Sequence, residues 1–224
     1  MYKVITLMKR RQGLSVEDFQ HQWLTRHAGL AAQTPGLRRY VQSHTLAQGY
    51  ARGERFYDGI SEMWFDDAAA WLAASAEPAH AAALAADEAT LIDAGRKVVM
   101  PVEALVVKDG PIPLDGVKNV EFVNRRPGMA LEPFRAYWRE VHGPLAAGIA
   151  LMRRYEQNHL RLDQYAAAKP PRFDGLAITW FDSTGDMKAG TQTEVYAHTR
   201  ADEANFLPDG HLPFIVTREH VIVA

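Results

Sequence analysis

Short apolar segments alternate with amphipathic ones along the first half of the chain, in the order strand, helix, strand, strand, helix, strand. Four strands are predicted, at residues 2–8, 37–46, 59–65 and 98–107. Ser15 with Asp18 three residues later is the signature of a helix N-terminus, and Thr34-Pro35-Gly36 ends that helix. Asp67 predicts the cap of a second, alanine-rich helical region.

The same pattern returns after 115 residues. Ten residues recur at this spacing, Gly13, Phe19, Trp23, His27, Leu30, Arg38, Arg39, Tyr40, Gln42 and His44, as Gly128, Phe134, Trp138, His142, Leu145, Arg153, Arg154, Tyr155, Gln157 and His159. A repeat of this length indicates two copies of one structural unit. We place the copies at 1–108 and 116–224, joined by a Pro- and Gly-containing linker at 109–115.

A βαββαβ unit is ferredoxin-like, and its helices cover only one face of its sheet. The other face is apolar and needs a partner, which the second copy supplies at high effective concentration. We therefore expect an α+β protein whose two units pair sheet to sheet as an intramolecular barrel. The alternative is two ferredoxin-like domains whose sheets do not touch.

Composition excludes several partners. The 224 residues are 47% hydrophobic and 23% charged, with a formal net charge of -2 and no cysteine. Nucleic acids and anionic membranes require clustered positive charge, so neither is an expected partner. No disulfide or thiolate is available, no secretory signal or membrane span is evident, and a cytoplasmic location is expected. No metal-ligand or phosphate-binding motif is evident, so no metal or cofactor is expected.

One histidine lies on an apolar stripe of the first helix of each copy. Trp23 and His27, and likewise Trp138 and His142, are four residues apart and share one helix face. Each histidine is either a core residue with a hydrogen-bond partner or a general acid or base that projects into a pocket.

The second strand of each copy carries polar residues on one face. These are Tyr40, Gln42 and His44 in the first copy and Tyr155, Gln157 and His159 in the second. If this face points toward the helices, the side chains can hydrogen-bond a substrate; if it points outward, they are ordinary polar positions. Glu62, in a strand where the second copy has Ile178, is either a buried base or the partner of Arg39 or Lys97.

The segments FRAYWREVHGPLA at 134–146, RRYEQNHL at 153–160 and FDGLAITWFD at 173–182 resemble the EthD family. The first copy shares them but has Ala28 and Gly29 where the second has Gly143 and Pro144. The resemblance implies a dimeric α+β barrel with a pocket between helices and sheet. The wider superfamily to which the chain is similar includes cyclases, dehydratases, decarboxylases, cofactor-free monooxygenases, isomerases and haem enzymes, so the fold alone does not choose a function.

The expected function is that of a cofactor-independent lyase, dehydratase, decarboxylase or cyclase for a hydrophobic, oxygenated or polyketide-like aromatic molecule. Histidines 27, 142, 44 and 159, with Glu62, are the candidate acids and bases. The apolar body of the ligand is expected to contact Trp23, Trp138, Trp64 and Trp180. The alternative is a non-catalytic small-molecule-binding or stress-response protein. The chain is expected to be a monomeric pseudo-dimer or a homodimer.

Overall fold

The computed structural model describes residues 1–224. Followed from neighbour to neighbour, the hydrogen-bonded strands run β1-β3-β2-β8-β5-β7-β6-β4, and this order closes into a barrel. The predicted α+β fold class is therefore confirmed. The chain forms two compact units, one of residues Met1–Val102 with Thr217–Ala224 and one of residues Glu103–Val216. Strands β4 (Val98–Lys108) and β8 (Phe214–Val223) each continue from one unit into the other.

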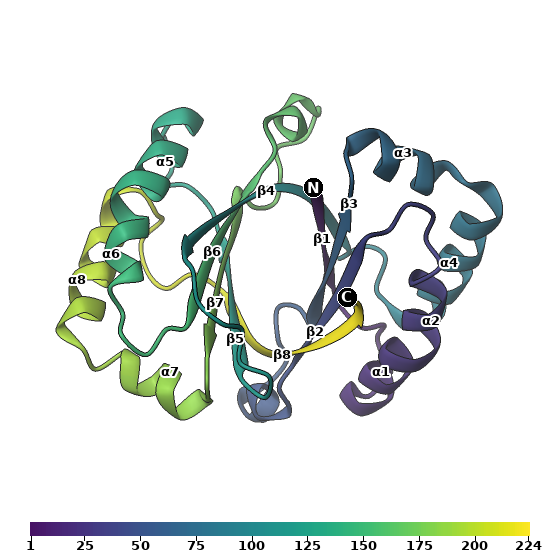
Figure 1. Ribbon diagram of the computed structural model, residues 1–224, viewed down its shortest axis with the longest axis horizontal. Helices are drawn as coiled ribbons and strands as arrows, with labels where there is room; N and C mark the ends of the chain where they lie inside the picture. Colours follow the sequence, from purple (N-terminus) through teal and green to yellow (C-terminus); the bar gives the residue numbers. More distant parts are fainter. The chain divides into compact units, whose positions relative to one another are not determined.

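The first unit has a sheet with helices on one face (Figure 1). Its strands are β1 (Tyr2–Met8), β2 (Arg39–Thr45) and β3 (Gly59–Phe65), with β4 paired to β1 and β8 paired to β2, all antiparallel. Its helices are α1 (Val16–Gln22), the π-helix η1 (Trp23–His27), α2 (Ala28–Ala31), the 3-10 helix η2 (Ala47–Arg52), α3 (Ala68–Ala76) and α4 (Pro78–Leu91).

The second unit repeats this arrangement, again with helices on one face of the sheet (Figure 1). Its strands are β5 (Val117–Val123), β6 (Arg154–Leu160) and β7 (Gly175–Phe181), with β7 between the other two. Its helices are α5 (Leu131–Tyr137), the π-helix η3 (Trp138–His142), α6 (Gly143–Ala147), the 3-10 helix η4 (Leu162–Ala166), α7 (Thr184–Gly190), α8 (Glu194–Asp202) and the 3-10 turn η5 (Glu203–Asn205). No helix combines the length and apolar character needed to cross a membrane.

The helix N-caps predicted from the sequence, Ser15 and Asp67, are present in the structure. The Ser15 side chain accepts a hydrogen bond from the Asp18 backbone N–H, and the Asp67 side chain accepts one from that of Ala70. Pro78 starts α4 and so divides the second helical region in two. The first helix is also divided, because a π-turn interrupts it in both copies. The sequence predicts one continuous helix there, since a π-turn keeps the apolar stripe intact.

A tryptophan at the start of each π-turn packs directly on a glycine of the sheet. Trp23 and Trp138 are almost completely buried. A Cβ atom on Gly59 would lie 2.5 Å from Trp23 Cζ3, and one on Gly175 would lie 2.8 Å from Trp138 Cζ3. Only glycine lets the indole approach the strand this closely. Helix and sheet are thereby fixed at one point in each unit.

A buried side-chain network ties the same turn to the second strand. Gln42 Nε2 donates to the Trp23 carbonyl at 3.0 Å and to the Tyr40 hydroxyl at 2.8 Å. His44 Nε2 lies 2.9 Å from Gln42 Oε1. In the second unit Gln157 Nε2 donates to the Trp138 carbonyl at 2.7 Å and to Tyr155, and His159 bonds Gln157. These polar side chains therefore form hydrogen bonds with the helix and with one another.

The tryptophan–glycine contact makes a stability prediction. Gly175→Ala places a Cβ 2.5 Å from the Asn158 carbonyl oxygen as well as against Trp138, so strand or indole has to shift. We expect the free energy of unfolding to fall by about 1–3 kcal/mol, the usual effect of overpacking a dense core. Urea unfolding followed by far-UV circular dichroism measures this change.

Gly29→Ala is the matched control, because a Cβ at this helical position meets nothing within 4 Å. We expect this variant to be unchanged or more stable by roughly 0.5–1 kcal/mol, since alanine favours the helix. Equal unfolding midpoints for Gly175→Ala and the wild type would show that the close contact does not constrain the unit.

Candidate functional site

A cavity of about 170 Å³ lies in the second unit between its sheet and its helices. One water molecule needs only ~10–15 Å³ by the same kind of measure, so the cavity has room for a larger molecule. Its apolar walls come from Val123, Trp138, Ala146, Ile149, Met152, Phe181, Met187, Phe206, Leu207 and Phe214. A mostly apolar cavity with a few convergent polar groups is the usual form of a small-molecule site.

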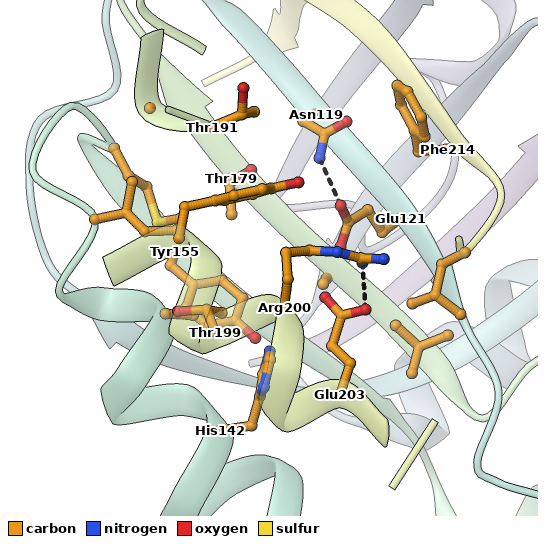
Figure 2. A pocket seen from close by; sticks show the side chains of 18 of the residues that line it. Asn119, Glu121, His142, Tyr155, Thr179, Thr191, Thr199, Arg200, Glu203 and Phe214 are labelled. Atoms are coloured by element: carbon orange, nitrogen blue, oxygen red, sulfur yellow. Dashed lines mark hydrogen bonds and ion pairs between the residues drawn. The ribbon is translucent and has the colours of Figure 1, made fainter. Parts of the chain in front are cut away.

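The floor of the cavity is a polar row across the sheet. Asn119 on β5 pairs with Thr179 on β7, which pairs in turn with Tyr155 on β6. Glu121, two residues after Asn119, lies on the same face of β5. Asn119 Nδ2 donates to Glu121 Oε1 at 3.3 Å, whereas the buried Asn119 Oδ1 has no hydrogen-bond partner. Figure 2 shows these side chains with Arg200 and Glu203 from the helical side.

His142 reaches the cavity from η3 and is held by a carboxylate. Its Nδ1 lies 3.0 Å from Asp202 Oδ2, and Asp202 also accepts hydrogen bonds from the Tyr137 hydroxyl at 2.6 Å and from Asn205 at 3.1 Å. Burial lowers the pKa of His142 below 6.5, and Asp202 partly opposes this effect. Although burial disfavours its charge, the bonds from Tyr137, His142 and Asn205 hold the pKa of Asp202 below 3.8.

This bonding fixes the state of the imidazole. An ionised Asp202 accepts a hydrogen bond, so the neutral ring carries its proton on Nδ1. Nε2 is then the ring nitrogen with a free lone pair, and His142 lines the cavity (Figure 2). A histidine positioned by a carboxylate in this way is the arrangement that a general base requires.

Two further carboxyl groups lie in the same cavity, on either side of Arg200 (Figure 2). Desolvation raises the pKa of Glu203 to about 7, even though Arg200 bonds it. Desolvation also raises the pKa of Glu121, opposed by Asn119 and Arg200. His211 Nδ1 lies 3.0 Å from an Arg200 nitrogen at the same side of the cavity. A carboxyl that is half-protonated near pH 7 is suited to act as an acid at neutral pH.

The first unit has the same histidine–aspartate pair, but apolar side chains fill the space that corresponds to the cavity. His27 Nδ1 lies 2.8 Å from Asp87 Oδ2, and Arg26 also pairs with Asp87. The residues equivalent to Asn119 and Thr179 are Val4 and Met63. They belong to an apolar cluster with Tyr2, Phe65, Ala74, Leu37, Ala68, Ala70 and Trp71. The second unit has Met187 at the position equivalent to Trp71.

His44 and His159, two candidate acids or bases, lie in the buried glutamine networks. The ring of His44 stacks on Trp23 at 4.3 Å, and that of His159 packs on Trp138 at 4.3 Å. Burial lowers the pKa of each to about 3, so both are neutral at physiological pH. Neither His159 nor Gln157 lines the cavity.

The remaining candidates, Glu62, Trp64 and Trp180, do not line the cavity. Glu62 forms a buried ion pair with Lys3 at 2.9 Å, and not with the predicted partners Arg39 or Lys97. Trp64 and Trp180 face cations rather than the cavity, since Lys3 Nζ and Lys118 Nζ lie 5.0 Å from their ring centroids. The cavity thus includes three of the candidates, Trp138, His142 and Tyr155.

Sequence reasoning missed several polar residues of the site. The carboxylate partners were readable from the repeat, because Asp87 and Asp202 each follow their histidine by 60 residues. The residues specific to the second copy were also readable, as polar side chains where the first copy has less polar ones. Asn119, Glu121 and Arg200 correspond to Val4, Thr6 and Ala85. No group of three or more metal-binding side chains is present.

A closed α+β barrel of two βαββαβ copies, with a cavity between helices and sheet, defines the class of dimeric α+β barrel proteins. Within that class the chain belongs to the EthD family, because the model of the EthD domain matches residues 11–95 and 126–209. The resemblance noted in the sequence is thereby confirmed in both copies. No curated protein matches the chain by sequence.

Solved structures share the fold over nearly the whole chain. An anthrone oxidase-like protein has a TM-score of 0.69 at 9% identity, covering 100% of this chain and 94% of its own. A protein proposed to be a monooxygenase, from Lactobacillus acidophilus NCFM, has a TM-score of 0.57 at 12% identity, with coverages of 98% and 94%. A mutant chlorite dismutase from Candidatus Nitrospira defluvii has a TM-score of 0.52 at 12% identity, with coverages of 99% and 92%. Identities this low show the fold alone.

The raised pKa of Glu203 predicts a pH dependence of stability. Its value is 4.5 for the free side chain and about 7 in the folded protein. The stability linked to this group is therefore fully present below pH 4.5 and is lost as the pH rises through 7. Between these limits the wild type should lose roughly 3 kcal/mol of unfolding free energy relative to Glu203→Gln, which is always neutral. Urea unfolding at a series of pH values measures the difference.

Glu88→Gln is the matched control, because Glu88 is the equivalent residue of the first copy and pairs with Lys97 at 2.7 Å. This variant should be no more stable than the wild type at any pH of the series, because the exchange removes one partner of the Glu88–Lys97 ion pair. If the unfolding free energies of the wild type and Glu203→Gln changed in parallel with pH, Glu203 would not be half-protonated near pH 7.

Proposed function

We propose that the second unit is a cofactor-independent acid–base catalyst for a hydrophobic, oxygenated small molecule, such as a β-keto or aromatic polyketide-like compound. The reaction type is that of a lyase, dehydratase, decarboxylase or cyclase. The observation that carries the proposal is the pairing of His142 with Asp202 in the cavity that also contains Glu203. A base and an acid are thus available to one bound molecule.

His142 is the proposed base. Its Nδ1 proton is committed to Asp202, so Nε2 accepts the substrate proton, and the resulting imidazolium is stabilised by the carboxylate. The lowered pKa keeps the ring neutral at physiological pH, in the form that accepts a proton. Tyr137 and Asn205 orient Asp202 from outside the cavity and thereby support the position of the imidazole.

Glu203 is the proposed acid. Near pH 7 Glu203 is protonated in about half of the protein molecules, and Arg200 bonds the carboxylate that remains after the proton is given up. A dehydration illustrates the step. Nε2 removes the proton next to a carbonyl, Glu203 protonates the hydroxyl on the neighbouring carbon, and water leaves as the C=C bond forms. The proton on His142 then returns to Glu203 through solvent, which restores both groups.

The apolar walls favour substrates whose body is aromatic or aliphatic. Trp138 and Phe206 are fully buried and line the cavity beside His142, whose ring centroid lies 4.7 Å from that of Phe206. An apolar wall lowers the local dielectric and strengthens the interaction of the reacting groups with developing charge.

The proposal predicts that His142→Gln loses catalysis. The probe is 4-hydroxy-4-phenylbutan-2-one, whose dehydration to 4-phenylbut-3-en-2-one is followed by ultraviolet absorbance. The exchange of its α-protons in D₂O is followed by NMR. We expect the wild type to accelerate both reactions and His142→Gln to lower the rates about 10²-fold to 10⁴-fold, since an amide cannot accept the proton. Asp202→Asn should also slow them, because it removes the carboxylate that orients the ring.

His27→Gln is the matched control, because it removes the equivalent histidine from the unit whose corresponding space is packed, and it should keep full activity. The wild-type rate should fall below pH 6.5, as His142 takes up a proton, and above about 7, as Glu203 loses one. Full activity of His142→Gln would refute the proposed base. Saturable binding of the probe with neither exchange nor dehydration would favour the non-catalytic binding protein.

A further inference from the structure

The floor of the cavity contains a polar atom that the protein leaves without a partner. Asn119 Oδ1 is buried and receives no hydrogen bond, while Nδ2 of the same amide donates to Glu121. A buried acceptor without a partner is destabilising, and native proteins contain few of them. Asn119 lines the cavity, so a molecule bound there is able to supply the missing hydrogen bond.

The other unit shows that the fold does not require a polar side chain at this position. Val4 occupies the equivalent place on β1, opposite Met63 on β3, and both are part of the packed apolar cluster. In the second unit the equivalent pair is Asn119 and Thr179, directly opposite each other on β5 and β7. One scaffold therefore carries an apolar pair where the space is filled and a polar pair where it is open.

The chemistry of this floor selects a hydroxyl group. With Glu121 ionised, Nδ2 donates to it and Oδ1 needs a donor; with Glu121 protonated, the amide turns over and its nitrogen needs an acceptor. A hydroxyl both donates and accepts, so it pairs with Asn119 in either state. The neighbouring Thr179 hydroxyl offers the second hydrogen bond that a ligand hydroxyl requires.

We propose that the molecule bound in this cavity carries a free phenolic or alcoholic hydroxyl that bonds Asn119, with Thr179 beside it. This inference rests on the proposed function, because it names a chemical feature of the ligand of the same site. Asn119 acts as a specificity residue: it selects hydroxylated over unsubstituted aromatic molecules and takes no part in moving protons. The apolar walls contact the remainder of the ligand.

The test compares 1-naphthol with 1-methylnaphthalene, which differ in a hydroxyl against a methyl group of similar size. Their dissociation constants are measured by competition with a fluorescent naphthalene dye, for the wild type and for Asn119→Val. We expect the preference for 1-naphthol to fall about tenfold in the variant, equivalent to roughly 1.4 kcal/mol. Valine is the residue that the first copy carries at this position, so the strand is expected to tolerate it.

Met187→Leu is the control, because it alters the apolar wall and should leave the ratio of the two dissociation constants unchanged. An unchanged ratio in Asn119→Val, or no displacement of the dye by 1-naphthol, overturns the inference. The two proposals fail separately. If Asn119→Val loses the preference but His142→Gln keeps its rate, the ligand class stands without the catalytic role. The reverse result leaves His142 as the base and removes the hydroxyl contact.

Discussion

The contact of a tryptophan ring with a glycine of the sheet determines how the helices and the sheet are arranged in each unit. Trp138 lies against Gly175, and its carbonyl accepts the Gln157 amide, so the π-turn is fixed to two strands at once. His142 is the last residue of that turn, and its direction follows from the position of Trp138. The site therefore depends on a steric constraint in the sheet, even though no residue of the contact takes part in the proposed proton transfers.

The two copies show how one scaffold supports different interiors. Both keep the tryptophan–glycine contact, the glutamine network and the histidine–aspartate pair. They differ in the side chains between helices and sheet, where Trp71 stacks on Tyr2 in the first unit and the second unit has an open cavity. The features common to both copies maintain the fold, and the features specific to one copy determine whether the space between helices and sheet is filled or open. A histidine–aspartate pair alone is thus not sufficient evidence of a site.

Sequence predicted the fold more fully than the site, for physical reasons. The repeat specified the element order, and an apolar sheet face that needs a partner specified the barrel. The sequence does not show toward which side a strand face points. Gln157 and His159 were therefore among the candidate site residues, although Gln157 bonds a helix carbonyl and His159 bonds Gln157. The partner of Glu62 was missed because Lys3 is distant in sequence and meets it only across paired strands. Comparison of the copies at Asn119 would have located the cavity.

The exchange of strand segments between the compact units has a consequence for the order of folding. Residues Thr217–Ala224 belong to the unit formed mostly by Met1–Val102, and they pair with β2. The ribosome synthesises them last, after the rest of the second copy, so the first unit lacks one edge strand throughout that time. An uncovered strand edge is a site for wrong pairing, and contacts distant in sequence form slowly. The first unit is thus the earliest to begin folding and among the last parts to be completed.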